Sequence, residues 1–200
     1  MQPLILKHSA TISSEESSSI LGALRDMASS NVWGVLWTEI ALVVLALVLL
    51  AIEMISPRAA FKHAGGIAVA GLLVILAVSL GQLISLSLSY GSISFSDTIL
   101  QTPMTAIMRV FFLLASVLVC YLGSVYFQKR NLPRVEFFSI VILMTVGILL
   151  LIQSNHFVLF FVALETITVG FYILVAYDRG STPSLESGLK YLIMGALSSA

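Results

Sequence analysis

The 200-residue sequence contains little charge of either sign. Ten residues are basic and ten are acidic, so the formal net charge is zero, and charged residues make up 10% of the chain against 58% for hydrophobic ones. Soluble domains carry charge on about a quarter of their residues. The composition therefore excludes a soluble globule and predicts an all-α membrane protein. The scattered basic residues form no stripe that would bind nucleic acid.

Residues for redox, metal or nucleophilic chemistry are also scarce. The single Cys120 excludes an intrachain disulfide and a cysteine-rich metal or iron–sulfur site. His8, His63 and His156 all lie outside the depths of the apolar runs, which excludes a haem held by paired imidazoles. No nucleotide-binding glycine loop occurs, and no serine, histidine and acid fall within one predicted cavity. We expect no metal, no cofactor and no redox site in this chain.

What the sequence does contain is a series of long apolar runs. A membrane-spanning helix takes about 20 residues. Five runs reach that length, and a sixth is still apolar at the last residue, so we expect a polytopic helix bundle and a sequence that is part of a longer chain. The expected spans are 32–55, 67–84, 104–127, 135–153 and 157–177, with an incomplete sixth at 186–200.

The polar segment 1–31 precedes these spans. Ser13 and Glu16 have the spacing of a capping box, and apolar residues then fall on one helical face up to Met27. A short helix at the membrane interface and a disordered tail are both compatible with this pattern.

One stretch between the second and third spans has a different period. Residues 84–90 and 92–96 alternate strictly between apolar and polar, with Gly91 between them. This pattern is typical of a β-hairpin. We expect the hairpin to lie outside the bilayer, because an open strand edge cannot face lipid.

Basic residues gather after every second span. They are Arg58 and Lys62 after the first, Lys129, Arg130 and Arg134 after the third, and Arg179 after the fifth. Loops rich in lysine and arginine stay in the cytoplasm. The distribution therefore predicts that these loops are cytoplasmic and that the N-terminus is outside.

The most informative residue is Glu165, the one ionisable carboxyl group near the middle of a span. A carboxylate at that depth costs about 2.5–3.5 kcal/mol on insertion scales. Burial favours the neutral acid, which ionises when a cation or water approaches, so Glu165 is a candidate proton relay. The alternative is a protonated side chain that only forms a hydrogen bond across the bundle.

Lys190 is the second candidate. At 1.5 Å per residue it lies roughly 6 Å below the inner surface, whereas Glu165 lies roughly 18 Å below it. We therefore expect no direct contact between the two, although water or a third ionisable group would connect them. The alternative for Lys190 is a lysine that extends toward the interface.

Three other charged residues lie near span ends. Glu39 is near the start of the first span and Glu136 at the start of the fourth, and both are weaker relay candidates. Glu39 is equally compatible with interface contacts and with a role inside the bundle. Arg109 lies about one turn into the third span, and we expect its side chain to extend to the interface.

Several of these candidate residues lie in segments that resemble a known family. The relevant segments are Glu136-Phe-Phe, Leu159-Phe-Phe-Val-Ala-Leu-Glu165, Tyr172-Ile-Leu-Val-Ala-Tyr177 and Leu185-Glu-Ser-Gly-Leu-Lys190-Tyr-Leu-Ile-Met-Gly-Ala-Leu-Ser-Ser199. They resemble subunit N of the bacterial proton-translocating NADH:quinone oxidoreductase, respiratory complex I, an antiporter-like membrane subunit. Trp37-Thr-Glu39-Ile is similar to the family's first-span Pro-Glu pair, with Thr38 in place of the proline. Arg109-Val-Phe-Phe is similar to its third span, where the family has a lysine.

The resemblance implies a proton-translocating subunit without a redox site of its own, in the inner membrane of a bacterium. Glu165 would be the buried glutamate that works with lysines, Lys190 among them, while a further lysine lies in the next span. NADH and quinone would be bound by other subunits, and the partners would be other membrane subunits, lipid and protons. Two alternatives remain: a cation/proton antiporter subunit of the same superfamily, and a structural membrane anchor.

Overall fold

The computed structural model describes residues 21–22, 36–55, 57–86, 92–94, 98–127 and 135–199, and gives the backbone alone for 57–63, 85–86, 92–94 and 199. Most of the polar segment 1–31, with its expected interfacial helix, lies outside the described residues. Lys129, Arg130 and Arg134 of the predicted cytoplasmic loops also lie outside them.

Six long helices and two short strands make up the described chain. They are α2 (Trp37–Ile55), α3 (Pro57–Leu86), β1 (Ser92–Ser94), β2 (Ile99–Gln101), α4 (Pro103–Phe127), α5 (Val135–Gln153), α6 (Phe157–Val175) and α7 (Thr182–Ser199). Five of the helices, α2 to α6, contain stretches long and apolar enough to cross a membrane. A helix suits lipid because it satisfies its own backbone hydrogen bonds. The predicted all-α membrane bundle is confirmed.

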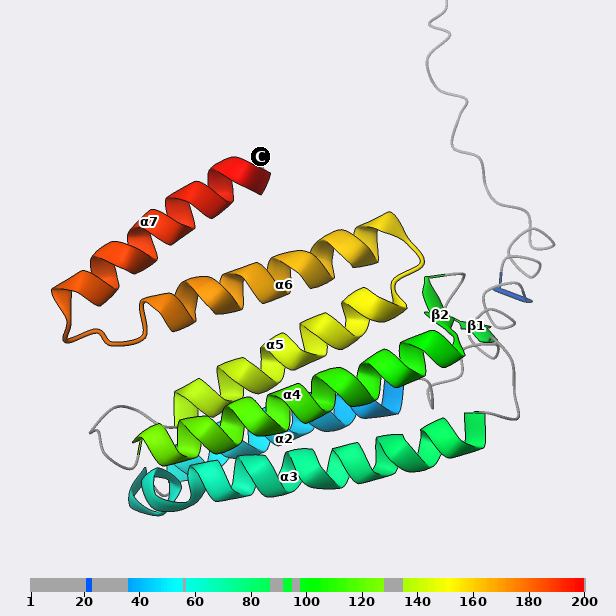
Figure 1. The fold of residues 1–200 in the computed structure, drawn as a ribbon, viewed down its shortest axis with the longest axis horizontal. Helices are drawn as coiled ribbons and strands as arrows, with labels where there is room; N and C mark the ends of the chain where they lie inside the picture. The colour runs from blue at the N-terminus through cyan, green and yellow to red at the C-terminus, as the bar shows by residue number, and fades with distance from the viewer. Residues whose placement is uncertain are drawn as a thin grey trace, which may run out of the picture.

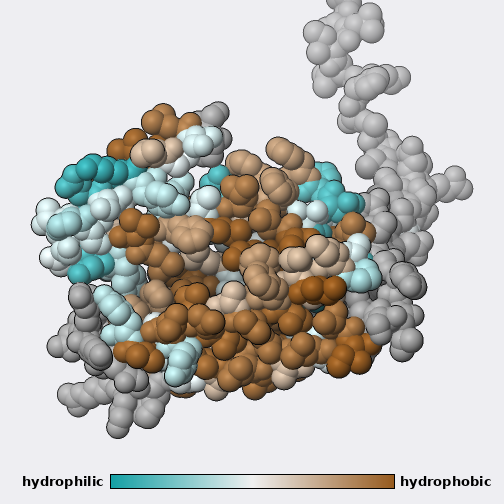
Figure 2. Space-filling model, in the orientation of Figure 1, coloured by the Kyte–Doolittle hydropathy of each residue, from teal (hydrophilic) through white to brown (hydrophobic). Residues whose placement is uncertain are grey.

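The helices run up and down beside one another, with α6 outside α5 and α7 outside α6 (Figure 1). α5 is the central helix: 56% of its span is buried, against 11% for α6. Apolar residues cover the middle of the visible face, and hydrophilic residues gather toward its ends (Figure 2). We call the end that carries β1 and β2 the hairpin end. α6 is thus largely exposed although it lies between α5 and α7.

The core lies between α2, α3, α4 and α5. Its best-buried side chains are Leu42, Leu49, Leu72, Leu113, Phe138, Ile142 and Leu149. A buried hydroxyl pair adds a polar link between α4 and α5, where Thr145 Oγ1 and Ser116 Oγ are hydrogen-bonded at 2.8 Å. Small and polar groups matter here because apolar side chains gain little by leaving lipid for one another.

The structure corrects the predicted hairpin. Residues 84–86 belong to α3, and β1 pairs with β2 in antiparallel register, Ile93 opposite Leu100. The first expected strand, 84–90, is therefore wrong in its first three residues, because continuing the helix keeps the backbone hydrogen-bonded. β2 also forms a bridge from Ile99 to Ser154, just beyond α5.

Some helix ends differ from the expected spans. α3 begins at Pro57, before its apolar stretch Ala64–Ile84. Arg58 and Lys62 therefore lie on a helical extension, and the loop predicted at these two residues is wrong. Proline suits the first helical position because it has no N–H to leave unbonded. α6 ends two residues earlier than expected and α7 begins four earlier.

The contact between α7 and the end of α6 depends on a glycine. Gly188 is the one buried residue among the described side chains of α7. A Cβ placed there would collide with the Cβ of Ala176 and would lie 3.1 Å from its Cα. Because backbone-anchored atoms cannot move aside as a long side chain does, only glycine allows this approach.

Replacing Gly188 with alanine should therefore weaken the packing of α7. We expect Gly188→Ala to lower the stability of the full-length protein by about 1–3 kcal/mol through overpacking. The matched control is Gly66→Ala in α3, where a Cβ meets no heavy atom within 4 Å. Thermal unfolding in detergent measures both variants. Equal stability of the two would contradict the close approach at Gly188.

Candidate proton-relay residues and a buried charge cluster

A cluster of polar side chains is buried at the hairpin end. Glu39 of α2, Arg109 of α4 and Gln153 of α5 are 4%, 6% and 1% exposed. Arg109 Nη2 donates to Gln153 Oε1 at 2.8 Å, and Gln153 Nε2 donates to Glu39 Oε1 at 2.6 Å. Arg109 Nη2 also lies 3.6 Å from Glu39 Oε1. One amide therefore bridges an ion pair across three helices.

This arrangement corrects the expectation for Arg109. Its side chain does not extend to the interface but turns into the bundle, because Glu39 and Gln153 supply acceptors there. It also decides between the two alternatives for Glu39, which lies inside the bundle rather than at its surface. Glu39 was a weaker relay candidate by sequence, and the structure places it in a buried ion pair with Arg109.

The orientation of the Gln153 amide follows from its partners. A guanidinium only donates and an ionised carboxylate only accepts, so the amide oxygen must face Arg109 and its nitrogen must face Glu39. The second hydrogen of Nε2 is donated to the carbonyl of Leu149 at 2.8 Å. Gln153 is thus held rigidly at the last residue of α5.

Sequence reasoning identified Gln153 only as the end of a span. A signal for the cluster was present, because the predicted topology places the starts of the first and third spans and the end of the fourth on one side. Opposite charges at Glu39 and Arg109 are then expected at the same end of the bundle. The shared end makes an ion pair between Glu39 and Arg109 a reasonable hypothesis, whereas the packing that brings Gln153 between them is visible only in the structure.

Glu165 lies at the ninth of the nineteen residues of α6, half-buried. Thr168 donates to its backbone carbonyl at 2.9 Å and lies 3.4 Å from its Oε2. The side chain borders an open, mostly apolar groove of about 460 Å³ between α5 and α6, which also includes Met144 and Gly170. The carboxyl group is therefore reachable from the side of the described bundle, unlike that of Glu39.

Lys190 lies on the exposed face of α7. Its Nζ donates to Glu186 Oε1 at 2.5 Å, one turn earlier on the same helix. Both side chains are well exposed, at 70% and 62%. Within the described residues no ion pair joins Lys190 to Glu165. The structure thus does not bring the two main candidates together.

Glu136 lies at the end opposite the hairpin. It forms an ion pair with Arg179 at 3.2 Å, on the connection between α6 and α7. Tyr177 lies nearby, and burial, assisted by the negative charge of Glu136, raises the pKa of its phenol to about 12. This phenol therefore stays neutral at physiological pH.

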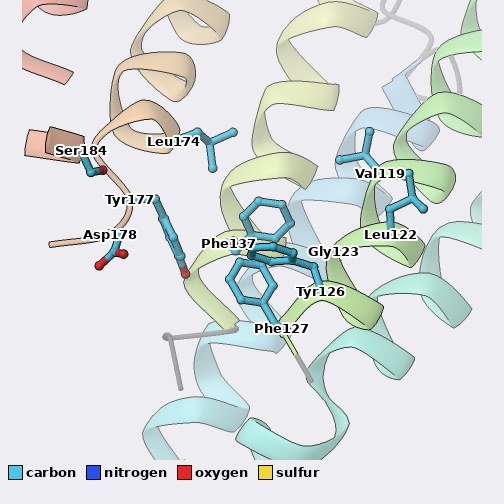
Figure 3. A pocket seen from close by; sticks show the side chains of 10 residues that line it. All are labelled: Val119, Leu122, Gly123, Tyr126, Phe127, Phe137, Leu174, Tyr177, Asp178 and Ser184. Carbon is cyan, nitrogen blue, oxygen red and sulfur yellow. The ribbon is translucent and has the colours of Figure 1, made fainter. Parts of the chain in front are cut away.

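Three aromatic rings pack against one another beside an open pocket at this end. The rings of Phe127, Phe137 and Tyr177 lie with centroids 4.9–6.0 Å apart, in edge-to-face contact. They line one side of an open pocket of about 470 Å³, with Asp178 and Ser184 at its rim (Figure 3).

The described residues contain no group of three or more metal-binding side chains.

Comparisons with known proteins give a consistent answer. The family model described as "NADH:quinone oxidoreductase/Mrp antiporter, TM" matches residues 154–200, which include Glu165 and Lys190. NADH-quinone oxidoreductase subunit N 1 of Opitutus terrae is 49% identical over 180 residues, 90% of this chain and 35% of that protein. The chain is a relative of subunit N. The predicted resemblance to subunit N is confirmed.

Other subunit N relatives are more distant. The protein of Rhodospirillum rubrum is 33% identical over 80% of this chain and 32% of its own length. NAD(P)H-quinone oxidoreductase subunit 2 of Gloeobacter violaceus is 29% identical over 87% of this chain and 33% of its own. The chain spans about a third of the length of these relatives of subunit N.

The fold has a solved counterpart. A chain in the structure of respiratory complex I from Thermus thermophilus with bound aureothin superposes with a TM-score of 0.59 at 23% identity. The match covers 80% of this chain and 33% of that one. It supports the antiporter-like fold expected from the resemblance to subunit N.

The buried cluster makes a prediction for stability. Arg109→Met should destabilise the full-length protein by about 3–5 kcal/mol, because the carboxylate of Glu39 would remain buried without its counter-charge. A second substitution, Glu39→Gln, should recover part of that loss by removing the buried charge. Thermal unfolding of both variants in detergent measures the effect.

The control for this prediction is Arg179→Met, which breaks the exposed ion pair with Glu136 and should cost about 0–1 kcal/mol. If Arg109→Met were as stable as Arg179→Met, the buried pair would contribute no more than a surface one, and the cluster would not hold α2, α4 and α5 together.

Proposed function

We propose that this chain is part of a membrane subunit of an NADH:quinone oxidoreductase that takes part in proton translocation coupled to quinone reduction. The observation that carries the proposal is the mid-span carboxyl group of Glu165, within a segment that matches the family model. The relatives are named NADH-quinone oxidoreductase subunit N, and these names support an NADH:quinone oxidoreductase as the complex to which the chain belongs. The chain contributes proton-carrying residues and no redox site.

In this proposal Glu165 accepts and releases protons. Its half-buried carboxyl group borders a groove between α5 and α6, so water or another helix reaches it from that side. Thr168, close to Oε2, orients the carboxyl group. A neighbouring positive charge stabilises the ionised form, and moving that charge away makes Glu165 take up a proton.

Lys190 is the candidate for such a charge, together with lysines outside this segment. Glu39 and Glu136 are additional candidate stations at opposite ends of the bundle. NADH and quinone would be bound by other subunits, and the partners of this chain would be other membrane subunits and lipid. We place it in a bacterial inner membrane with the hairpin end outside, as the basic residues favour.

The first test is Glu165→Gln in the assembled complex, reconstituted in vesicles. The substitution keeps size and polarity but cannot exchange a proton, so we expect proton pumping per NADH oxidised to fall. Glu53→Gln is the matched control, a glutamate near the end of α2 to which no relay role is assigned. Pumping at the wild-type ratio in Glu165→Gln would refute the assignment.

The role of Lys190 has its own test. Lys190→Ala should lower turnover or pumping, because the charge that acts on Glu165 is lost. Lys190→Arg keeps the charge and should retain most of the activity. Unchanged turnover in Lys190→Ala would favour a lysine that only extends to the interface.

The second candidate function is a cation/proton antiporter subunit, favoured by the family model's description, which includes Mrp antiporters. Its Glu165 and Lys190 would serve ion exchange without a redox partner. Co-purification with a quinone-reducing assembly supports the first function. Sodium-dependent proton flux in the absence of such an assembly supports the second, and a Glu165 that tolerates replacement in both assays supports a structural anchor.

A further inference from the structure

The open pocket at the end opposite the hairpin is a groove between two helices that both pack on α5. α4 forms one wall, and the end of α6 with its connection to α7 forms the other, while the Phe137 ring of α5 lies between them (Figure 3). Gly123 of α4 allows the ring to lie this close, because a Cβ there would be 2.7 Å from Cε1 of Phe137. The groove measures about 470 Å³, within the range of about 300–1,000 Å³ usual for small-molecule sites.

The groove is apolar at its inner end and polar at its rim. Val119, Leu122 and Leu174 line the inner end, and Asp178 lies at the rim. Val119 is eight residues before the end of α4, about 12 Å along the helix at 1.5 Å per residue. The hydrocarbon core of a bilayer is about 30 Å thick, so a groove that starts at the end of a span and extends this far lies partly within the core.

The rim offers hydrogen-bond acceptors and a negative charge. One oxygen of Asp178 accepts from a backbone N–H two residues later at 3.2 Å. Arg179 beside it is engaged by Glu136 at 3.2 Å, whereas no ion pair engages Asp178 among the residues that the structure describes. The hydroxyl of Ser184 already donates its hydrogen to the last carbonyl of α6 at 3.1 Å, so only its lone pairs remain. A positively charged donor therefore complements this rim.

We propose that the groove binds a membrane phospholipid whose headgroup carries a primary ammonium group. One acyl chain would lie along Leu122 of α4 and Leu174 of α6, and the ammonium would donate to Asp178 and Ser184. A primary ammonium has three hydrogens to donate, enough for both acceptors. A purely anionic headgroup would instead meet the carboxylate of Asp178 with like charge. The inference goes beyond the proposed function and does not depend on the proton role of Glu165.

A lipid matches this pattern of polarity better than a helix of another protein does. A phospholipid has one polar end, which stays at the level of the interface, and the polar groups of the groove lie at that level. Tyr126 and Tyr177 lie toward the same end, and tyrosine is enriched where headgroups meet the hydrocarbon. A protein helix would have to place a basic side chain at the rim to meet the same charge.

The first test fills the groove. Leu122→Trp puts a large side chain on its inner wall, and Leu114→Trp makes the same change at an exposed position of α4 outside the groove. The full-length protein in detergent is titrated with phosphatidylethanolamine, and native mass spectrometry measures the bound lipid. We expect the wild type and Leu114→Trp to bind this lipid alike and Leu122→Trp to lose it.

The second test removes the charge at the rim. Asp178→Asn keeps an oxygen for the backbone N–H but loses the negative charge. Its binding of phosphatidylethanolamine should weaken about two- to fivefold, the size expected for a charge contact near water. Phosphatidylglycerol with the same acyl chains has no ammonium group. We expect the wild type to bind it more weakly than phosphatidylethanolamine, and Asp178→Asn to bind both lipids equally.

Three results would overturn the inference. They are retention of phosphatidylethanolamine by Leu122→Trp, wild-type binding of phosphatidylglycerol as tight as that of phosphatidylethanolamine, and a protein helix seated in the groove in a high-resolution structure of the assembled protein. If Leu122→Trp fails to fold, the ratio of the two affinities in Asp178→Asn decides. Lipid binding is measured without proton pumping, so a wild-type pumping ratio in Glu165→Gln would refute the proposed function and leave this inference standing.

Discussion

A charged side chain between membrane helices must find its partners inside the protein, and this requirement organises the hairpin end of the bundle. Glu39 accepts, Arg109 donates and Gln153 does both, so each residue supplies what another needs. Removing Glu39 or Arg109 would leave the other charge buried alone. Apolar contacts select partners poorly in lipid, because lipid tails are as apolar as leucine. The charge cluster therefore adds a specific link among α2, α4 and α5 that apolar contacts alone do not provide.

The spans were predictable because each is a local property. Length and hydropathy place a helix in lipid, and a helix satisfies its own backbone, so α5 begins at Val135 and ends at Gln153 as expected. The cluster was not predicted because it is a long-range property: Gln153 lies 44 residues from Arg109 and 114 from Glu39. The hairpin prediction failed for a related reason. Alternation in 84–90 does not identify the strand with which this segment would pair.

Glu165 can be identified from its depth in a predicted span, whereas the buried position of Glu39 can be identified only from the contacts between helices. Depth along the chain indicated Glu165 alone, and the structure places it in the middle of α6 with Thr168 of its own helix beside it. Environment indicates Glu39, which lies nearer a span end but is buried against partners from two other helices. Position in a span is a one-dimensional quantity and can be counted from sequence. The partner of a buried charge depends on packing between helices and has to come from the fold.

The two ends of the bundle use the same pair of residue types with different consequences. At the hairpin end the arginine–glutamate pair is buried and bridged by an amide, whereas the Arg179–Glu136 pair at the opposite end is 77% and 38% exposed. Water competes for an exposed pair, so that pair is weak and its geometry easily changed. The described bundle is thus held firmly where α2, α4 and α5 meet and more loosely where α6 passes to α7. The exposed Lys190 on α7 changes position at lower cost than a charge in the buried cluster, and the role proposed for Lys190 requires this property.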